Sequence, residues 1–151
     1  MGQTHFSGPV IVGTLTTGQT SGPNQGYAVL EQSTSITQNS TTAVSSTLYI
    51  PAGSRIIDII VDVLTAFNSG TSAVLSVGTA AAGTQYASTV DVKTATGRIR
   101  PTFTAAQLAA MDNVSVLGVA APTTAPVVVT VTPTGATSAG YVQITVVYAQ
   151  T

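Results

Sequence analysis

From residue 27 onward, short segments rich in Val, Ile, Thr and Tyr alternate with clusters of turn-forming residues. β-Branched and aromatic residues favour extended strands, and turn signals between such segments are typical of an all-β sandwich or barrel. We interpret 55–78 and 126–149 as two long hairpins of similar texture. The pattern predicts strands over residues 27–37, 43–50, 55–67, 72–78, 86–93, 113–119, 126–132 and 140–149.

One short helix interrupts the strand pattern, and its first turn is well specified. Thr104 and Gln107 have the spacing of a capping box, in which each side chain bonds the backbone N–H of the other residue. We therefore expect a helix over 105–111 that closes one end of the β core.

The predicted fold is all-β: an antiparallel β-sandwich, jelly-roll-like, that occupies residues 27–151 and includes the short helix. A β-barrel or a tulip-shaped domain is the alternative, because turn spacing does not determine strand connectivity. Residues 1–26 are rich in Gly and Pro and show little periodicity, so we interpret them as an extended N-terminal arm. Such an arm becomes ordered by lying on a partner, and His5, Phe6 and Val10 are its candidate contacts.

The composition favours association over catalysis. Charged residues make up 6% of the chain, against about 25% in a typical soluble domain, and the formal net charge is −1. Because a nearly neutral chain tends to associate, we expect a homo-oligomer whose function lies in a surface. Neither nucleic acid nor a membrane is expected as a partner, since the chain lacks clustered Lys and Arg and has no long apolar run. With no Cys and one His, we also expect no disulfide, no zinc site and no cofactor.

Asp58 and Asp62 are the residues most open to a catalytic interpretation, because they lie in otherwise apolar sequence. On a strand they share one face with Ile56, about 13 Å apart, whereas glycosidase carboxyls lie roughly 5–10 Å apart. We therefore expect no catalytic and no metal site. The opposite face is predicted to be apolar, with Ile57, Ile59, Val61 and Val63. Calcium binding is the alternative, with Asp58, Asp62, Asp91 or Asp112 as ligands.

Basic residues provide partners for these carboxylates. Arg98 and Arg100 alternate onto one face of the segment 96–101, and Arg55 begins the strand that carries both aspartates. The pairs could form within the chain at a solvated edge, or between subunits, where guanidinium groups suit interface pairing. We favour pairing between subunits. The candidate interface residues are then His5, Phe6, Val10, Arg55, Asp58, Asp62, Arg98 and Arg100.

Three segments carry a resemblance to a known class of protein: THFSGPV (4–10), the long stretch from IPAGSRIIDIIVDVLTAF to GTQY (50–86), and GYVQITVVYAQT (140–151). In texture and order they are similar to small virion proteins of tailed bacteriophages that decorate, or cement, the head. The resemblance implies a β-rich trimer at threefold positions of the capsid surface, made in the host cytoplasm and bound to the major capsid protein.

Two other functions compete with head decoration. One is a tail, collar or head-fibre subunit built on a similar sandwich. The other is a carbohydrate-binding β-sandwich module that uses exposed tyrosines. The scatter of the tyrosines over the predicted strands favours core and interface packing instead, at Tyr27, Tyr49, Tyr86, Tyr141 and Tyr148.

Overall fold

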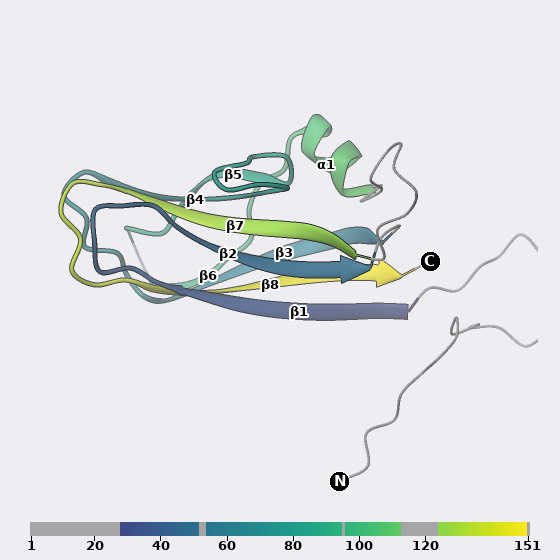
Figure 1. Cartoon of the computed structure of the whole chain (residues 1–151), viewed down its shortest axis with the longest axis horizontal. Coiled ribbons are helices and arrows are strands. Elements are labelled where there is room, and N and C mark those ends of the chain that lie inside the picture. The colour runs from purple at the N-terminus through teal and green to yellow at the C-terminus, as the bar shows by residue number, and fades with distance from the viewer. Residues whose placement is uncertain (1–27, 52–53, 95, 113–123, 151) are drawn as a thin grey trace, which may run out of the picture.

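A computed structural model of the protein describes residues 28–51, 54–94, 96–112 and 124–150 (Figure 1). In this part of the chain the all-β class and the single short helix are confirmed. The elements are β1 (Ala28–Thr37), β2 (Val44–Pro51), β3 (Arg55–Thr65), β4 (Ser72–Gly78), β5 (Ala87–Asp91), β6 (Gly97–Ile99), α1 (Ala105–Asp112), β7 (Thr124–Thr134) and β8 (Tyr141–Gln150).

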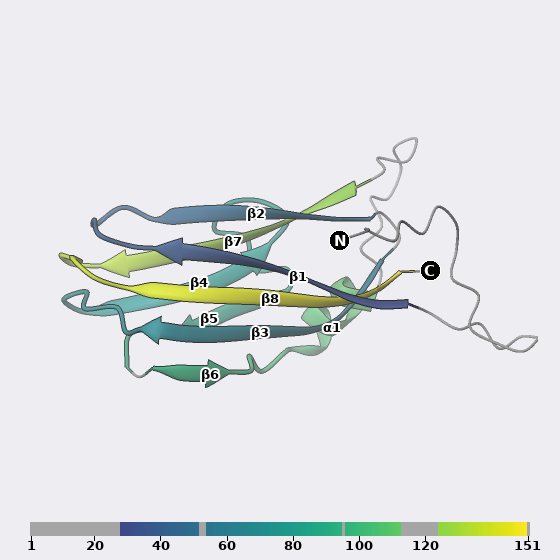
Figure 2. The same ribbon diagram turned by 90° about the horizontal axis from the view of Figure 1, so that it is seen from below.

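The strands form two four-stranded antiparallel sheets that pack as a sandwich (Figures 1 and 2). Sheet A has the order β1-β8-β3-β6, and sheet B has the order β2-β7-β4-β5. Four pairs nest inside one another along the chain: β1 with β8, β2 with β7, β3 with β6 and β4 with β5. Two further pairs, β3 with β8 and β4 with β7, join these nested pairs into the two sheets. This connectivity is that of a jelly roll. The jelly-roll-like sandwich is therefore confirmed.

The core lies between the sheets and consists largely of β-branched side chains. In β7, Val127, Val129 and Val131 are fully buried. In β3, Val61 is buried, and the aspartates on the opposite face are half-exposed. Each aliphatic side chain of this size contributes roughly 1.5–3 kcal/mol on leaving water, so the alternating pattern selects one face of each strand for the core.

The two hairpins expected over 55–78 and 126–149 are wrong. β3 lies in sheet A and β4 in sheet B, and β7 and β8 are divided between the sheets in the same way. Each connection therefore passes from one sheet to the other at an end of the sandwich, a distance of about 10 Å (Figure 1). Turn residues mark where the chain reverses, but they do not specify which sheet the next strand joins.

The two faces of β3 also differ from the prediction at its start. The pairing of β3 with β8 shifts register between Ile56 and Asp58, which is the mark of a β-bulge. As a result Ile56 is buried and Ile57 is 48% exposed, the reverse of the predicted assignment. An extra residue in one strand reverses the face to which each preceding side chain of that strand points. No local pattern in the sequence indicates such a residue.

Most strand boundaries agree with the prediction to within two residues. The strand predicted over 55–67 ends at Thr65, and Phe67 is instead buried in the connection that follows. β6 was not predicted, because its three residues are too few to show a period. The strand predicted over 113–119 and the N-terminal arm over 1–26 lie outside the described residues.

The predicted capping box is confirmed at the start of α1. The Thr104 N–H donates to Gln107 Oε1 at 2.9 Å, and the Gln107 N–H donates to Thr104 Oγ1 at 3.2 Å. Gln107 is nearly buried, and its amide also donates to the Thr84 carbonyl and to Ser88 Oγ, each at 3.1 Å. One side chain thus starts the helix and ties it to the segment around β5.

Candidate interaction surfaces

Four of the predicted interface residues come together on the outer face of sheet A. Asp62 of β3 lies directly opposite Arg98 of β6. Two hydrogen bonds join them, from Nε to Oδ1 at 2.8 Å and from Nη2 to Oδ2 at 3.0 Å. Arg100 Nη1 lies 3.0 Å from Asp58 Oδ2. We call these four residues the ion-paired strip; both of its pairs form within one chain.

The electrostatics of the strip are those of matched surface charges. The Arg98 guanidinium lowers the pKa of Asp62, mainly through its hydrogen bonds, and Asp62 in turn raises the pKa of Arg98. A bidentate fork of this kind fixes geometry well. Both arginine side chains are nevertheless more than half exposed, so we expect the strip to contribute little to stability.

The strip does not assemble a carboxylate pair for acid–base chemistry, because each aspartate faces a guanidinium. The other two candidate calcium ligands also have partners within the chain. Asp91 accepts hydrogen bonds from the Lys93 N–H and the Thr94 hydroxyl, and Asp112 pairs with an arginine. Within residues 28–51, 54–94, 96–112 and 124–150, no group of three or more His, Cys, Asp or Glu side chains could hold a metal ion.

Arg55 lies apart from the strip and pairs with Asp112, the last residue of α1. A carboxylate at a helix C-terminus is unfavourable beside the helix dipole, and the guanidinium offsets this. The pair borders a shallow depression between β3 and α1. Leu108 and Ile57 line it and are 52% and 48% exposed, so this end of the sandwich carries a small apolar patch.

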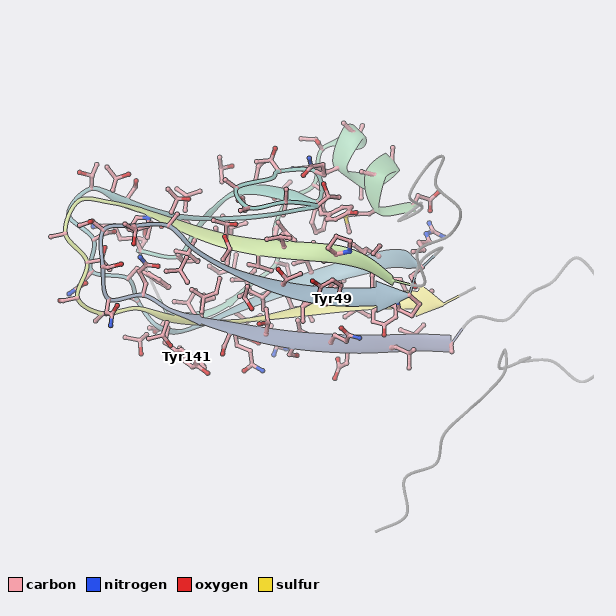
Figure 3. The ribbon with its side chains drawn as sticks, in the orientation of Figure 1. Tyr49 and Tyr141 are labelled. Atoms are coloured by element: carbon pink, nitrogen blue, oxygen red, sulfur yellow. The ribbon has the colours of Figure 1, made fainter. Side chains whose placement is uncertain are left out.

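The tyrosines do not form a platform in the described part of the chain. Tyr86 and Tyr148 are buried, and burial raises the pKa of Tyr86. Tyr49 on β2 and Tyr141 on β8 belong to different sheets and lie well apart along the sandwich (Figure 3). The remaining predicted contacts and the remaining tyrosine lie outside the described residues, namely His5, Phe6, Val10 and Tyr27.

Sequence reasoning missed the surface that the fold leaves most open to pairing. β1 is an edge of sheet A and β2 an edge of sheet B, and a hydrogen bond of 2.6 Å joins Thr34 Oγ1 to Ser46 Oγ between them. β1 pairs with β8 over ten residues and β2 with β7 over eight, both without a register shift. No described residue pairs with their outer edges, where half of the backbone N–H and C=O groups point. We call β1, β2 and these two edges the open side.

The open side is almost without charge. Glu31 is the one charged residue between positions 28 and 51. Exposed hydroxyls line the outward positions of both strands, and Val29, Leu30 and Tyr49 are 61%, 42% and 60% exposed. The lack of charge over 28–51 was the signal that could have revealed an unprotected edge.

The opposite side of the sandwich, formed by β5 and β6, is protected. β5 has five residues, and Thr89 (φ 55°) lies where its pairing with β4 shifts register. The connection 79–86 folds over the outer face of sheet B, where the Ala82 N–H donates to Thr130 Oγ1 of β7 at 2.9 Å. Gly78 permits this, because a Cβ there would lie 2.7 Å from the Gly83 Cα. We call β5, β6 and their outer edges the covered side.

No family model, curated protein or solved structure compared with the chain matches it. Among the described residues, no helix is long and apolar enough to cross a membrane.

Proposed function

We propose that the chain is a structural virion protein that binds the outside of a tailed-bacteriophage head as a homo-oligomer and stabilises the shell. Its partner on the head is the major capsid protein. The protein is made in the host bacterial cytoplasm, and its final location is the capsid surface. The observation that carries the proposal is the open side, because two long, regular and nearly uncharged strand edges suit pairing between copies of the chain into a homo-oligomer.

Two further features support the same function. The jelly roll supplies a rigid body with a continuous aliphatic core, and the ion-paired strip gives the outer face of sheet A a fixed pattern of charge. The resemblance of segments 4–10, 50–86 and 140–151 to head decoration proteins points to the same class of partner.

The mechanism follows from mass action. A protein that binds only the assembled shell lowers the free energy of that shell by an amount that grows with the ratio of free protein to Kd. An oligomer that contacts several capsid subunits gains from avidity, since each further contact forms at a high effective concentration. Weak individual contacts are then sufficient.

Sedimentation with phage heads tests the proposal. The purified chain is mixed with heads that lack it, and binding and the temperature of DNA release are measured. We expect saturable binding and a release temperature several degrees higher. Failure to bind heads would overturn the proposal. Immunogold labelling on the tail or collar would favour the tail-subunit alternative, and binding on a glycan array would favour the carbohydrate-binding one.

A further inference from the structure

We propose that β1 of one copy pairs antiparallel with β2 of the next copy, and that three such pairings close a ring about a threefold axis parallel to the strands. The inference deepens the proposed function and rests on it for the copy number of three. The pairing itself is argued from the open side. Its partner is a second copy of this chain.

The directions of the two edges suit this pairing. Within one copy β1 and β2 run in opposite directions on the same side of the sandwich (Figures 1 and 2). Rotation about an axis parallel to the strands leaves their directions unchanged, so β1 meets the β2 of the next copy antiparallel. A head-to-tail contact of this kind uses both edges of every copy and closes into a ring. A twofold contact of β1 with β1 would leave every β2 edge unpaired.

The register follows from one hydrogen bond. Thr34 and Ser46 are bonded within a copy, so they lie at the same height along the strands. Rotation causes no shift along its own axis, and Thr34 therefore lies level with Ser46 of the next copy as well. Counting outward along antiparallel strands places Ser33 opposite Thr47 and Glu31 opposite Tyr49.

In this register, the exposed side chains of the two strands lie on the same face, and no like charges oppose each other. Ser33 and Thr47 are both exposed and both point away from their own core, so they share one face of the combined sheet. Glu31 is the one charged residue of the two strands, so no like charges lie opposite each other. Half-buried Gln32 donates to the hydroxyl of buried Tyr148 at 3.4 Å, so it lies on the other face of β1, which faces the core.

Because the chain contains no cysteine, engineered disulfides give a clean test. Ser33 and Thr47 lie on opposite outer faces of one copy, so a bond between cysteines at these positions can form only between copies. Directly opposite Cβ atoms in a sheet lie about 4.5–5.5 Å apart, close to disulfide geometry. Oxidised full-length S33C/T47C is expected to run as a covalent trimer that reverts to single chains on reduction.

Controls are the single variants S33C and T47C, which should remain uncrosslinked. The pair S35C/S45C repeats the test two residues along the strands, in case the first variant folds poorly; circular dichroism verifies the fold of each. A covalent dimer of S33C alone would overturn the inference in favour of a twofold contact. A series of covalent oligomers that does not stop at three chains would also overturn the inference. So would the absence of a crosslink in both double variants.

The outcome is separable from that of the proposed function. Chains that bind heads without crosslinking would overturn the β1–β2 pairing and leave the decoration function standing. A covalent trimer that does not bind heads would support the pairing and overturn the decoration function.

Discussion

The two long sides of this sandwich differ in how far their edge strands are protected from pairing with other chains. On the open side, β1 and β2 have ten and eight residues, pair regularly with their neighbours and carry one charge, Glu31. On the covered side, β5 and β6 have five and three residues, Thr89 interrupts the pairing of β5, and Arg98 and Arg100 flank the edge.

The contrast shows that protection is not a property of the fold. Short edge strands, bulges and charges are the usual means by which proteins prevent strands of other chains from adding to a sheet. The chain uses all three on one side and almost none on the other. Each side of the jelly roll has one edge strand from each sheet. The difference between the sides therefore lies in the side chains and the strand lengths. This difference indicates which side pairs with another chain.

The largest effect is expected at the connection 79–86, which lies over the outer face of sheet B. Gly78→Ala should lower the free energy of unfolding by about 3 kcal/mol, because its Cβ would collide with the Gly83 backbone and lift the connection 79–86 off the sheet. Chemical denaturation measures this. Gly70→Ala is the matched control, since its Cβ would have no neighbour nearer than 3.7 Å. Equal costs for the two variants would show that the connection does not need the glycine.

A smaller loss is expected at the link between α1 and β5. Gln107→Ala removes half of the capping box and both bonds from the amide to Thr84 and Ser88, and should cost about 2 kcal/mol. Gln107→Glu keeps the acceptor for the Thr104 N–H, so its loss of unfolding free energy should be smaller than that of Gln107→Ala. Exposed Gln143→Ala is the control and should change the unfolding midpoint little. A null effect at Gln107 would mean that the helix does not hold the covered side.

On the open side the corresponding test is the hydroxyl pair between β1 and β2. Thr34→Val and Ser46→Ala should each cost about 1 kcal/mol, because each leaves one half-buried hydroxyl without its partner. The double variant should cost less than the sum, since both polar groups are then removed. A double-mutant cycle at one fixed protein concentration measures this coupling. Strict additivity would show that the bond does not couple the edges.

The smallest effect is expected from the ion-paired strip, and it has a defined pH dependence. Arg98 lowers the pKa of Asp62 in the folded protein below its ordinary 3.8. The pair therefore stabilises the fold above pH 3.8, and its contribution is lost as the pH falls through the lowered pKa. Asp62→Asn should lower the melting temperature slightly at pH 7, and this difference should shrink as the pH falls below 3.8. Salt at 1 M should also reduce the difference. A difference in melting temperature that does not shrink below pH 3.8 would assign the effect to packing.

Much of the fold could be predicted because its signals are local. The Thr104 and Gln107 side chains start α1 in the manner expected from their spacing alone. Alternation in β3 from Asp58 onward, and the valines of β7, mark which side chains are buried. The aspartates were correctly assigned to a half-exposed strand face. Pairing between subunits was favoured from the sequence, whereas both aspartates pair with arginines of the same chain.

The features that were missed depend on contacts between distant segments. The bulge at Ile57 is defined by the pairing of β3 with β8, and β6 is defined by the pairing of residues 97–99 with β3. The open side was missed for the same reason: whether a strand lies at an edge depends on the order of all four strands in its sheet.

By itself, the sequence determined where strands lie, which face of most of them is apolar and where the helix begins. These properties depend on neighbouring residues, because side-chain alternation and capping act over a few positions. The tertiary structure decided which sheet each strand joins, which arginine meets which aspartate, and which two edges remain open. The physical reason is that burial is non-directional: many strand orders bury the same apolar faces, and one of them is selected by the summed packing of the whole core.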